Sequence, residues 1–251
     1  MTATPPIVDR ETWQRQVDAL RAREKAHTRE GDAIAAARRR LPMVEVDPAT
    51  PLVGAAGELP LIEAFEGRPQ LFASFHMWHR GRSAADQCEG CTFNSGAVLE
   101  LSYLHSRGVG FAVFCQGPYP ESARYRAFMD WPMPWYSVPE GSVDRLVAGR
   151  HFGMKVCYLR EGDRVFETYW TTARGCEVMG SSYGMLDLTV YGRQEGWEDS
   201  PAGWPQPFGT GPGEPFRTGG RPISQWPRLA AGRSDDLGTD PETGSGGGCC
   251  H

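Results

Sequence analysis

Two cysteines separated by two residues, in Cys88-Glu89-Gly90-Cys91, form the group in this sequence that is best suited to do chemistry. A dithiol of this spacing can act as a redox pair, in which one thiolate attacks a disulfide and the second sulfur resolves the mixed disulfide. The same two sulfurs can instead hold Cu(I) or Zn(II), because soft thiolate ligands select these ions. In a third interpretation, both cysteines are unreactive residues at the end of a helix. The spacing alone leaves all three open.

Two histidines, His76 and His79, precede the cysteine pair. With Cys88 and Cys91 they would make a Cys2His2 set, which suits tetrahedral zinc or copper. Residues three apart at the end of an extended strand point to different faces, so a shared metal requires a turn after Phe75. In the redox interpretation, His76 stabilises the thiolate or relays a proton.

The residues around the cysteines predict a strand, a loop and a helix. The apolar segment 71–75 is typical of a buried strand. Apolar side chains then recur at helical spacing, at Phe93, Ala97, Leu101 and Leu104. We therefore expect a helix that opens at or just after the cysteine pair. The partial positive charge and free N–H groups of a helix N-terminus favour a thiolate on the first, more exposed cysteine. This residue is the predicted nucleophile, and the second cysteine is its resolving partner.

The rest of the chain alternates strand-like and helix-like segments, which predicts an α/β layer domain over residues 51–195. We expect strands at 109–115, 154–159 and 164–169, the last two as a hairpin, and helices at 121–130, 142–152 and 182–191. Ser142 is the predicted N-cap of its helix. Residues 1–50 form a helical extension of one or two surface helices broken near Gly31, and residues 196–251 form an irregular, partly disordered tail.

The chain ends in Cys249-Cys250-His251. In a flexible tail, these residues can act as a mobile thiol arm that exchanges with the cysteine pair or passes on a metal ion. The alternative is a chain end of no functional consequence.

Composition limits the partners and the compartment. The net charge of -5 argues against a general nucleic-acid binder, whose footprint is basic. No stretch approaches the roughly 20 apolar residues that span a bilayer, and no secretory signal is visible at the N-terminus. We therefore expect a cytoplasmic protein without nucleic-acid or membrane partners, whose substrate is a small molecule or a thiol. In that compartment, seven cysteines do not predict a disulfide framework.

The predicted order of strand, CxxC helix, strand, helix, antiparallel hairpin and final helix resembles a thioredoxin fold of the peroxiredoxin-like kind. In thioredoxins a cis-proline precedes the hairpin and faces the cysteine pair, whereas this chain has Phe152-Gly153-Met154 there. Because the cis-proline shapes the substrate groove in those enzymes, the resemblance does not imply ordinary disulfide exchange on protein substrates.

Several separated motifs resemble a more specific family. They occur in order over roughly residues 10–195 and are Arg38-Arg39-Arg40-Leu41-Pro42-Met43-Val44, Phe65-Glu66-Gly67-Arg68-Pro69-Gln70-Leu71, Trp131 with Pro134-Trp135, Thr168-Tyr169, Arg174-Gly175, Leu186-Asp187-Leu188-Thr189 and Gly192-Arg193-Gln194-Glu195. Together they resemble the thioredoxin-like family catalogued as domain of unknown function 899. The family usually has His-Phe-Met-Phe at the end of the first strand and a proline inside the CxxC. The added His79 favours metal binding here, and Glu89 in place of proline leaves the helix start more flexible.

The sequence therefore favours a thiol-disulfide-type oxidoreductase on a thioredoxin-like fold that works through Cys88 and Cys91, assisted by His76. The alternative is a copper- or zinc-binding protein, either a carrier or a metal-dependent oxidase, that uses His76 and His79 with the two cysteines. A regulatory or interaction module without chemistry is the third possibility.

Overall fold

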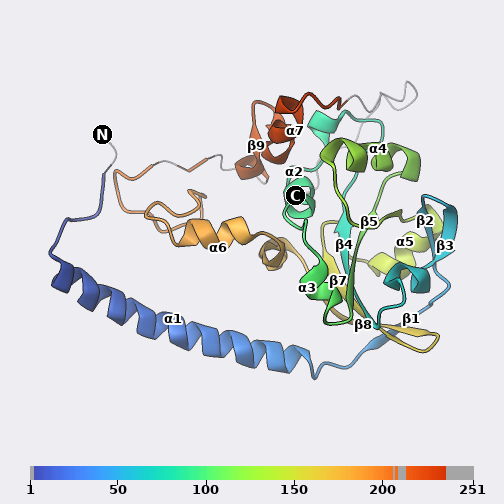
Figure 1. The fold of residues 1–251 in the computed structure, drawn as a ribbon, viewed down its shortest axis with the longest axis horizontal. Helices are drawn as coiled ribbons and strands as arrows, with labels where there is room; N and C mark the ends of the chain where they lie inside the picture. The colour runs from blue at the N-terminus through green and yellow to red at the C-terminus, as the bar shows by residue number, and fades with distance from the viewer. Residues whose placement is uncertain (1–2, 206, 209–212, 236–251) are drawn as a thin grey trace.

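A computed structural model describes residues 3–205, 207–208 and 213–235 and shows a mixed α/β protein built on a curled eight-stranded sheet (Figure 1). The terminal Cys249-Cys250-His251 lies outside the described residues. The strand order across the sheet is β1-β8-β7-β4-β5-β6-β2-β3. The strands are β1 (Val44–Val46), β2 (Pro51–Gly54), β3 (Gly57–Pro60), β4 (Gln70–His76), β5 (Val109–Cys115), β6 (Trp135–Ser137), β7 (Lys155–Glu161) and β8 (Arg164–Thr171).

The centre of the sheet matches the sequence prediction. Strand β4 is central, and it pairs parallel with β5 and antiparallel with β7. Strands β7 and β8 form the predicted antiparallel hairpin. Because β4 and β5 are covered on both faces, both are nearly continuous apolar runs, which is why their positions could be predicted from hydrophobicity alone.

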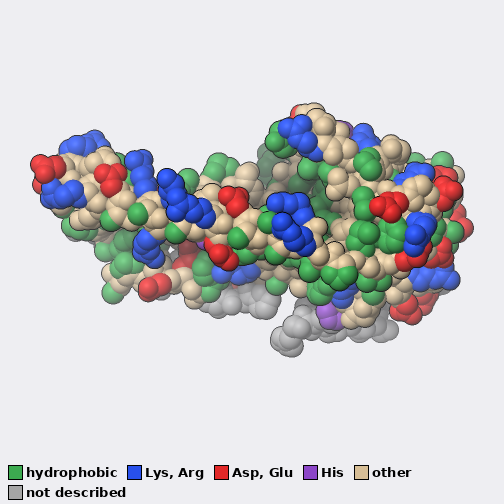
Figure 2. Space-filling model, turned by 90° about the horizontal axis from the view of Figure 1, so that it is seen from below, with side chains coloured by type: hydrophobic (Ala, Val, Ile, Leu, Met, Phe, Trp, Pro, Cys, Tyr) green, Lys and Arg blue, Asp and Glu red, His purple; other side chains and the backbone are tan. Residues whose placement is uncertain are grey.

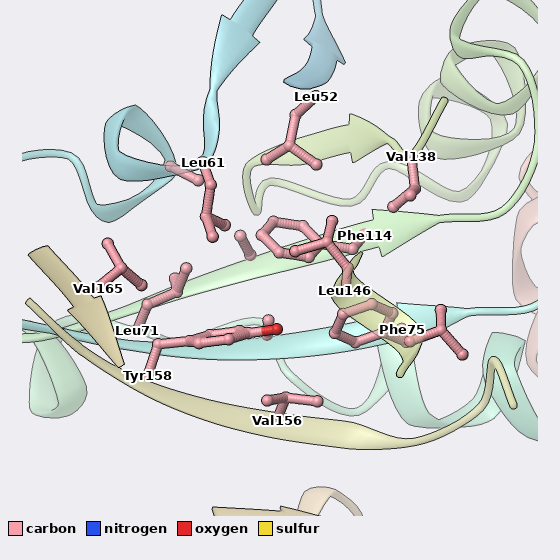
Figure 3. Packing of buried hydrophobic residues seen from close by; sticks show 14 of the residues in the cluster. Leu52, Leu61, Leu71, Phe75, Phe114, Val138, Leu146, Val156, Tyr158 and Val165 are labelled. Atoms are coloured by element: carbon pink, nitrogen blue, oxygen red, sulfur yellow. The ribbon is translucent and has the colours of Figure 1, made fainter. Parts of the chain in front are cut away.

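One face of the sheet packs on the larger hydrophobic core (Figure 3). Alternate residues of β4 and β5, among them Leu71, Phe75 and Phe114, point into it. The 3-10 helix η1 (Leu61–Phe65) and the helix α5 (Glu140–Val147) cover this face and contribute Leu61 and Leu146. The period of two along each strand therefore divides the apolar residues between two cores.

The opposite face holds the second core and the cysteine pair. Phe111 and Val113 of β5 pack there with Tyr125 and Phe128 of the helix α4 (Tyr119–Met129). Trp131 joins them, so the aromatic segment after α4 contributes to the core. The remaining helical elements are α2 (Glu89–Gly96), α3 (Ser102–His105), α6 (Ser181–Asp187), α7 (Trp226–Ala230), η2 (Ala84–Asp86), η3 (Ala173–Met179), η4 (Glu214–Phe216) and η5 (Ile223–Gln225); β9 (Arg217–Thr218) and β10 (Arg221–Pro222) form a separate two-stranded sheet.

The helix α1 (Arg10–Arg38) projects from the sheet as an arm (Figure 1). It contains no buried residue, and Trp13 is 45% exposed. Lys and Arg side chains lie along it (Figure 2). The predicted break near Gly31 is wrong: the helix is continuous. A glycine inside a helix costs about 1 kcal/mol relative to alanine, which the alanines that follow it offset. No helix among the described residues has the length and apolarity to cross a membrane.

Three helix predictions need correction. The helix predicted to begin at Ser142 begins at Glu140, after Pro139 at the N-cap, and Ser142 is buried in the first turn. An acidic residue in the first turn suits the helix dipole. The final helix ends at Asp187, before the β-branched residues 189–190, which favour helix less. The helical pattern after the cysteines is divided: α2 ends at Gly96, and α3 is a separate turn.

Candidate active site

The cysteine pair lies at the N-terminus of α2, as the sequence predicts. Cys88 is the N-cap residue, and its sulfur accepts a hydrogen bond from the backbone N–H of Cys91 at 3.4 Å. The sulfur of Cys91 accepts a hydrogen bond from the backbone N–H of Met77 at 3.4 Å. Cys88 is half-buried, whereas Cys91 is 5% exposed. Both sulfurs therefore face N–H groups that stabilise negative charge, and Cys88 is the more accessible one.

The pair keeps one proton when its first thiol ionises. A hydrogen bond from the thiol of Cys88 lowers the pKa of Cys91, and the charge of Lys155 and the N–H of Met77 lower it further against the effect of burial. The same hydrogen bond and burial raise the pKa of Cys88. The hydrogen bond from Cys88, the charge of Lys155 and the N–H of Met77 favour the first thiolate on the buried Cys91, whereas the helix N-terminus favours it on Cys88.

His76 lies at the end of β4 and is 1% exposed. Its Nδ1 forms a hydrogen bond of 3.1 Å with the hydroxyl of Ser95 in α2. Its ring packs against Trp131, Trp135 and Tyr125, with ring centroids 5.8, 5.1 and 6.4 Å apart. The hydrogen bond to Ser95 connects β4 to the helix that carries the cysteines, so His76 fixes the position of α2 over the sheet.

The environment of His76 keeps its imidazole neutral. Burial lowers the pKa of His76 to about 3, because an apolar surrounding disfavours the charged form. Its Nε2 is buried and has no hydrogen-bond partner among the described residues. A neutral ring brings no positive charge to the cysteine pair. The predicted role in stabilising the thiolate therefore cannot be an ion pair with imidazolium.

His79 lies in the loop between β4 and η2 and is exposed. Its backbone N–H donates to the side-chain oxygen of Gln87 at 2.9 Å, and the Gln87 amide donates to the carbonyl of His79 at 2.8 Å. Burial lowers the pKa of His79. Within the described part of the chain, no three His, Cys, Asp or Glu side chains are grouped so that they could hold a metal. The structure thus does not bring His76, His79, Cys88 and Cys91 together as the predicted copper or zinc ligands.

Lys155 is a residue of this site that the sequence reasoning missed. It is the first residue of β7 and is 1% exposed. Its ammonium donates to the carbonyl of Gly153 at 3.3 Å, and the thiol of Cys176 donates to the same carbonyl at 3.3 Å. Lysine is almost never fully buried unless it is paired. The one signal in the sequence was a lysine inside the apolar run 154–159.

A chain of buried hydrogen bonds holds the first turn of α2 in place. The Thr92 hydroxyl donates to the carbonyl of Cys88 at 2.8 Å and is 2.7 Å from the hydroxyl of Tyr125. The amide of Gln225 donates to that Tyr125 hydroxyl and to the carbonyl of Ala84, both at 2.7 Å. Because the Thr92 proton is used on Cys88, Tyr125 must donate to Thr92, and each group in the chain is satisfied.

The segment 213–235, which we call the C-terminal strap, packs over α2 (Figure 1). Arg217 binds the carboxylate of Glu89 inside the CxxC at 3.1 and 3.2 Å. It also donates to the carbonyls of Ala85 and Gln87 at 2.8 and 3.0 Å. The ring of Phe216 packs on Phe93 and Tyr183 with centroids 5.1 and 6.3 Å apart. The strap therefore fastens a distant part of the chain to the cysteine loop, and Glu89 anchors it.

A family model described as "Bacterial protein of unknown function (DUF899)" matches residues 2–210. The chain belongs to this family. The match confirms the resemblance found in the separated motifs, and it contains both cysteines and Lys155 but ends before the strap. A search of the curated proteins finds no match. The family description names no activity, so the function must be argued from the site.

Proposed function

We propose that this member of the DUF899 family is a thiol-disulfide-type oxidoreductase that works through Cys88 and Cys91. The observation that carries the proposal is the arrangement of the two sulfurs: each accepts a backbone N–H, and they share the N-terminus of one helix. This arrangement lets one sulfur carry a stabilised negative charge while the other stays accessible. An unreactive core cysteine has no need of either feature.

We propose a thioredoxin-like fold for the central domain. The strand order β8-β7-β4-β5 and the parallel pairing of β4 with β5 support it, as does the helix α2 that follows β4. In that fold the redox dithiol opens the helix after the first central strand, which is the place of the cysteine pair here. Strand β6 and the helix α4 before it are additions of the peroxiredoxin-like kind.

The proposed reaction uses the two sulfurs in different roles. The Cys88 sulfur attacks a substrate disulfide and passes its proton to the Cys91 thiolate, and the first substrate thiolate leaves. Cys91 then loses that proton to water, and its thiolate attacks the Cys88 sulfur and releases the second substrate thiolate. The protein dithiol gives up two electrons and becomes a disulfide, and the substrate disulfide becomes two thiols. A dithiol reductant returns the protein to its starting state.

The strap and the half-buried position of Cys88 favour a small-molecule disulfide or thiol over a folded protein as the substrate. A protein substrate would have to place its own disulfide beside the loop that Arg217 closes. We also propose a reducing compartment, the cytoplasm, in which the five cysteines that the structure describes are free thiols.

Trapping of a mixed disulfide tests the proposal. A Cys91→Ser variant treated with oxidised glutathione is expected to accumulate glutathione on Cys88, located by peptide mass spectrometry so that the terminal Cys249 and Cys250 are counted separately. The Cys88→Ser variant is expected to accumulate far less, because Cys91 is buried. Cys157→Ser is the matched control, since burial raises the pKa of Cys157 to about 11 and leaves it unreactive.

Metal chemistry gives a different result in the same experiment. If the wild-type cysteines react with maleimide or glutathione only after a chelator is added, a bound metal ion protects them, and the oxidoreductase proposal is overturned. Elemental analysis of protein purified without chelators identifies the ion in that case.

A further inference from the structure

Lys155 lies on the sheet face that α2 covers. In the antiparallel pairing of β4 with β7, Lys155 is directly opposite Ser74, and opposite residues point to the same face. His76, two residues further along β4, shares that face. Because His76 contacts Ser95 of α2, the face is the one beneath the cysteine helix. The lysine is therefore placed beneath the CxxC by the register of the sheet, and not by a loop.

The ammonium of Lys155 has few partners for a group so deeply buried. It has three donors, and the carbonyl of Gly153 accepts one of them. None of the ion pairs found in the described residues includes Lys155. A buried cation without an anion is costly by several kcal/mol. An anion that is part of the same site would remove that cost.

The thiolate of Cys91 is the anion that fits. Burial raises the pKa of Cys176, whose thiol shares the Gly153 carbonyl with Lys155, so that Cys176 remains a hydrogen-bond donor. Burial also raises the pKa of Cys115 to about 12. Among the described cysteines, Cys91 is the one whose pKa is lowered, and Lys155 contributes to the lowering.

We infer that Lys155 is a positioning residue that holds the negative charge of the reduced dithiol on Cys91 and thereby sets the reduction potential of the pair. The inference rests on the proposed function. In the reduced state the pair carries one proton on Cys88 and one negative charge on Cys91, which the ammonium of Lys155 stabilises. Oxidation removes two electrons and that one proton and leaves a neutral disulfide, so the ammonium loses its anion. Lys155 therefore stabilises the reduced state and makes the disulfide a stronger oxidant.

The charge effect is measured on single cysteines, which separates it from turnover. In a Cys88→Ser background, the pH profile of Cys91 ionisation, followed by the ultraviolet absorbance of the thiolate because Cys91 is buried, is expected to move to higher pH when Lys155→Met is added. In a Cys91→Ser background, the profile of Cys88 ionisation, followed in the same way, is expected to move much less. Lys155→Arg, which keeps the charge, is expected to restore the Cys91 profile. Equal movement of both profiles would mean that the substitution only disturbs the fold, and no movement of the Cys91 profile would overturn the inference.

The redox effect is measured by equilibrium with glutathione. We expect Lys155→Met to favour the disulfide at least tenfold over wild type, about 30 mV for this two-electron couple, and Lys155→Arg to stay close to wild type. An unchanged constant in a folded Lys155→Met protein contradicts the inference. If wild type forms no Cys88–Cys91 disulfide, the proposed function fails, while the ionisation profiles still test Lys155. If Lys155→Met unfolds the protein, Lys155→Gln, which removes the charge but keeps a hydrogen-bond donor, takes its place in both measurements with the same expected shifts.

Discussion

The neutral, buried state of His76 predicts how the stability of the fold depends on pH. In the unfolded chain, His76 takes up a proton near its ordinary pKa of about 6.5. In the folded protein its pKa is about 3. Between these values the unfolded state binds one more proton than the folded state, so acid favours unfolding. The stabilising effect is complete above about pH 6.5 and is lost as the pH falls toward 3.

The magnitude follows from the two pKa values. One proton changes the free energy of unfolding by about 1.4 kcal/mol per pH unit inside this window. From pH 7 to about pH 4.5, His76 alone should therefore lower the free energy of unfolding by about 2 to 3 kcal/mol. Solvent does not screen the charge of His76, because the residue is 1% exposed.

Urea denaturation of the reduced protein at several pH values between 4.5 and 7.5 measures the effect. A His76→Asn variant keeps a polar group near Ser95 and removes the titration, so its stability should fall less steeply with acid than that of wild type. Carboxylates titrate equally in both proteins, and the difference between the two slopes isolates His76. His27→Asn, at an exposed position of α1, is the control and should leave the slope unchanged. Identical slopes for wild type and His76→Asn would refute a neutral, buried His76.

Two further predictions concern packing and the strap. A Cβ at Gly117 would overlap the ring of Trp78, so Gly117→Ala should lower the free energy of unfolding by about 1 to 3 kcal/mol. Gly141→Ala, in open space within α5, should raise that free energy by about 0.5 to 1 kcal/mol. Urea titration measures both, and a Gly117→Ala variant as stable as wild type would show that Trp78 can move. Arg217→Gln removes charged hydrogen bonds worth about 1 to 3 kcal/mol each, so it should speed alkylation of the cysteine pair and tryptic cleavage of the strap. The control Arg15→Gln, on the exposed helix α1, should change neither rate. An unchanged alkylation rate in Arg217→Gln would show that the strap does not limit access to the cysteines.

The central strands and the start of α2 could be predicted because local signals determine them. Strand β4 is an apolar run bounded by polar residues, and the hairpin of β7 and β8 surrounds the turn residues 161–163. The N-cap position of Cys88 follows from the same local pattern. The break proposed at Gly31 failed because a local signal was given too much weight: one glycine does not outweigh a long run of helix-forming neighbours.

The strap and Lys155 could not be predicted because their roles depend on contacts between distant residues. Gln225 donates hydrogen bonds to Tyr125 and Ala84, which lie 100 and 141 positions away along the chain. Its segment contains few apolar residues, and the sequence therefore favours an irregular tail. For Lys155 the sequence favours an exposed position, since a lysine in a strand is normally assigned to the solvent side. Only the register of β7 against β4 shows that it points beneath the cysteine helix.

The two cysteines have complementary properties, because one carries the negative charge of the thiolate and the other is accessible to a substrate. A lowered pKa makes a thiolate more abundant at a given pH but also an intrinsically weaker nucleophile, because nucleophilicity falls with pKa. Cys91 carries the charge where Lys155 and the N–H of Met77 stabilise it, and it is too buried to meet a substrate. Cys88 keeps the proton and is the sulfur that a substrate can reach, and it becomes a strong nucleophile when the neighbouring thiolate takes that proton. The thiolate of Cys91 thus serves first as a base and then as the resolving sulfur, and this order requires the buried charge that Lys155 maintains.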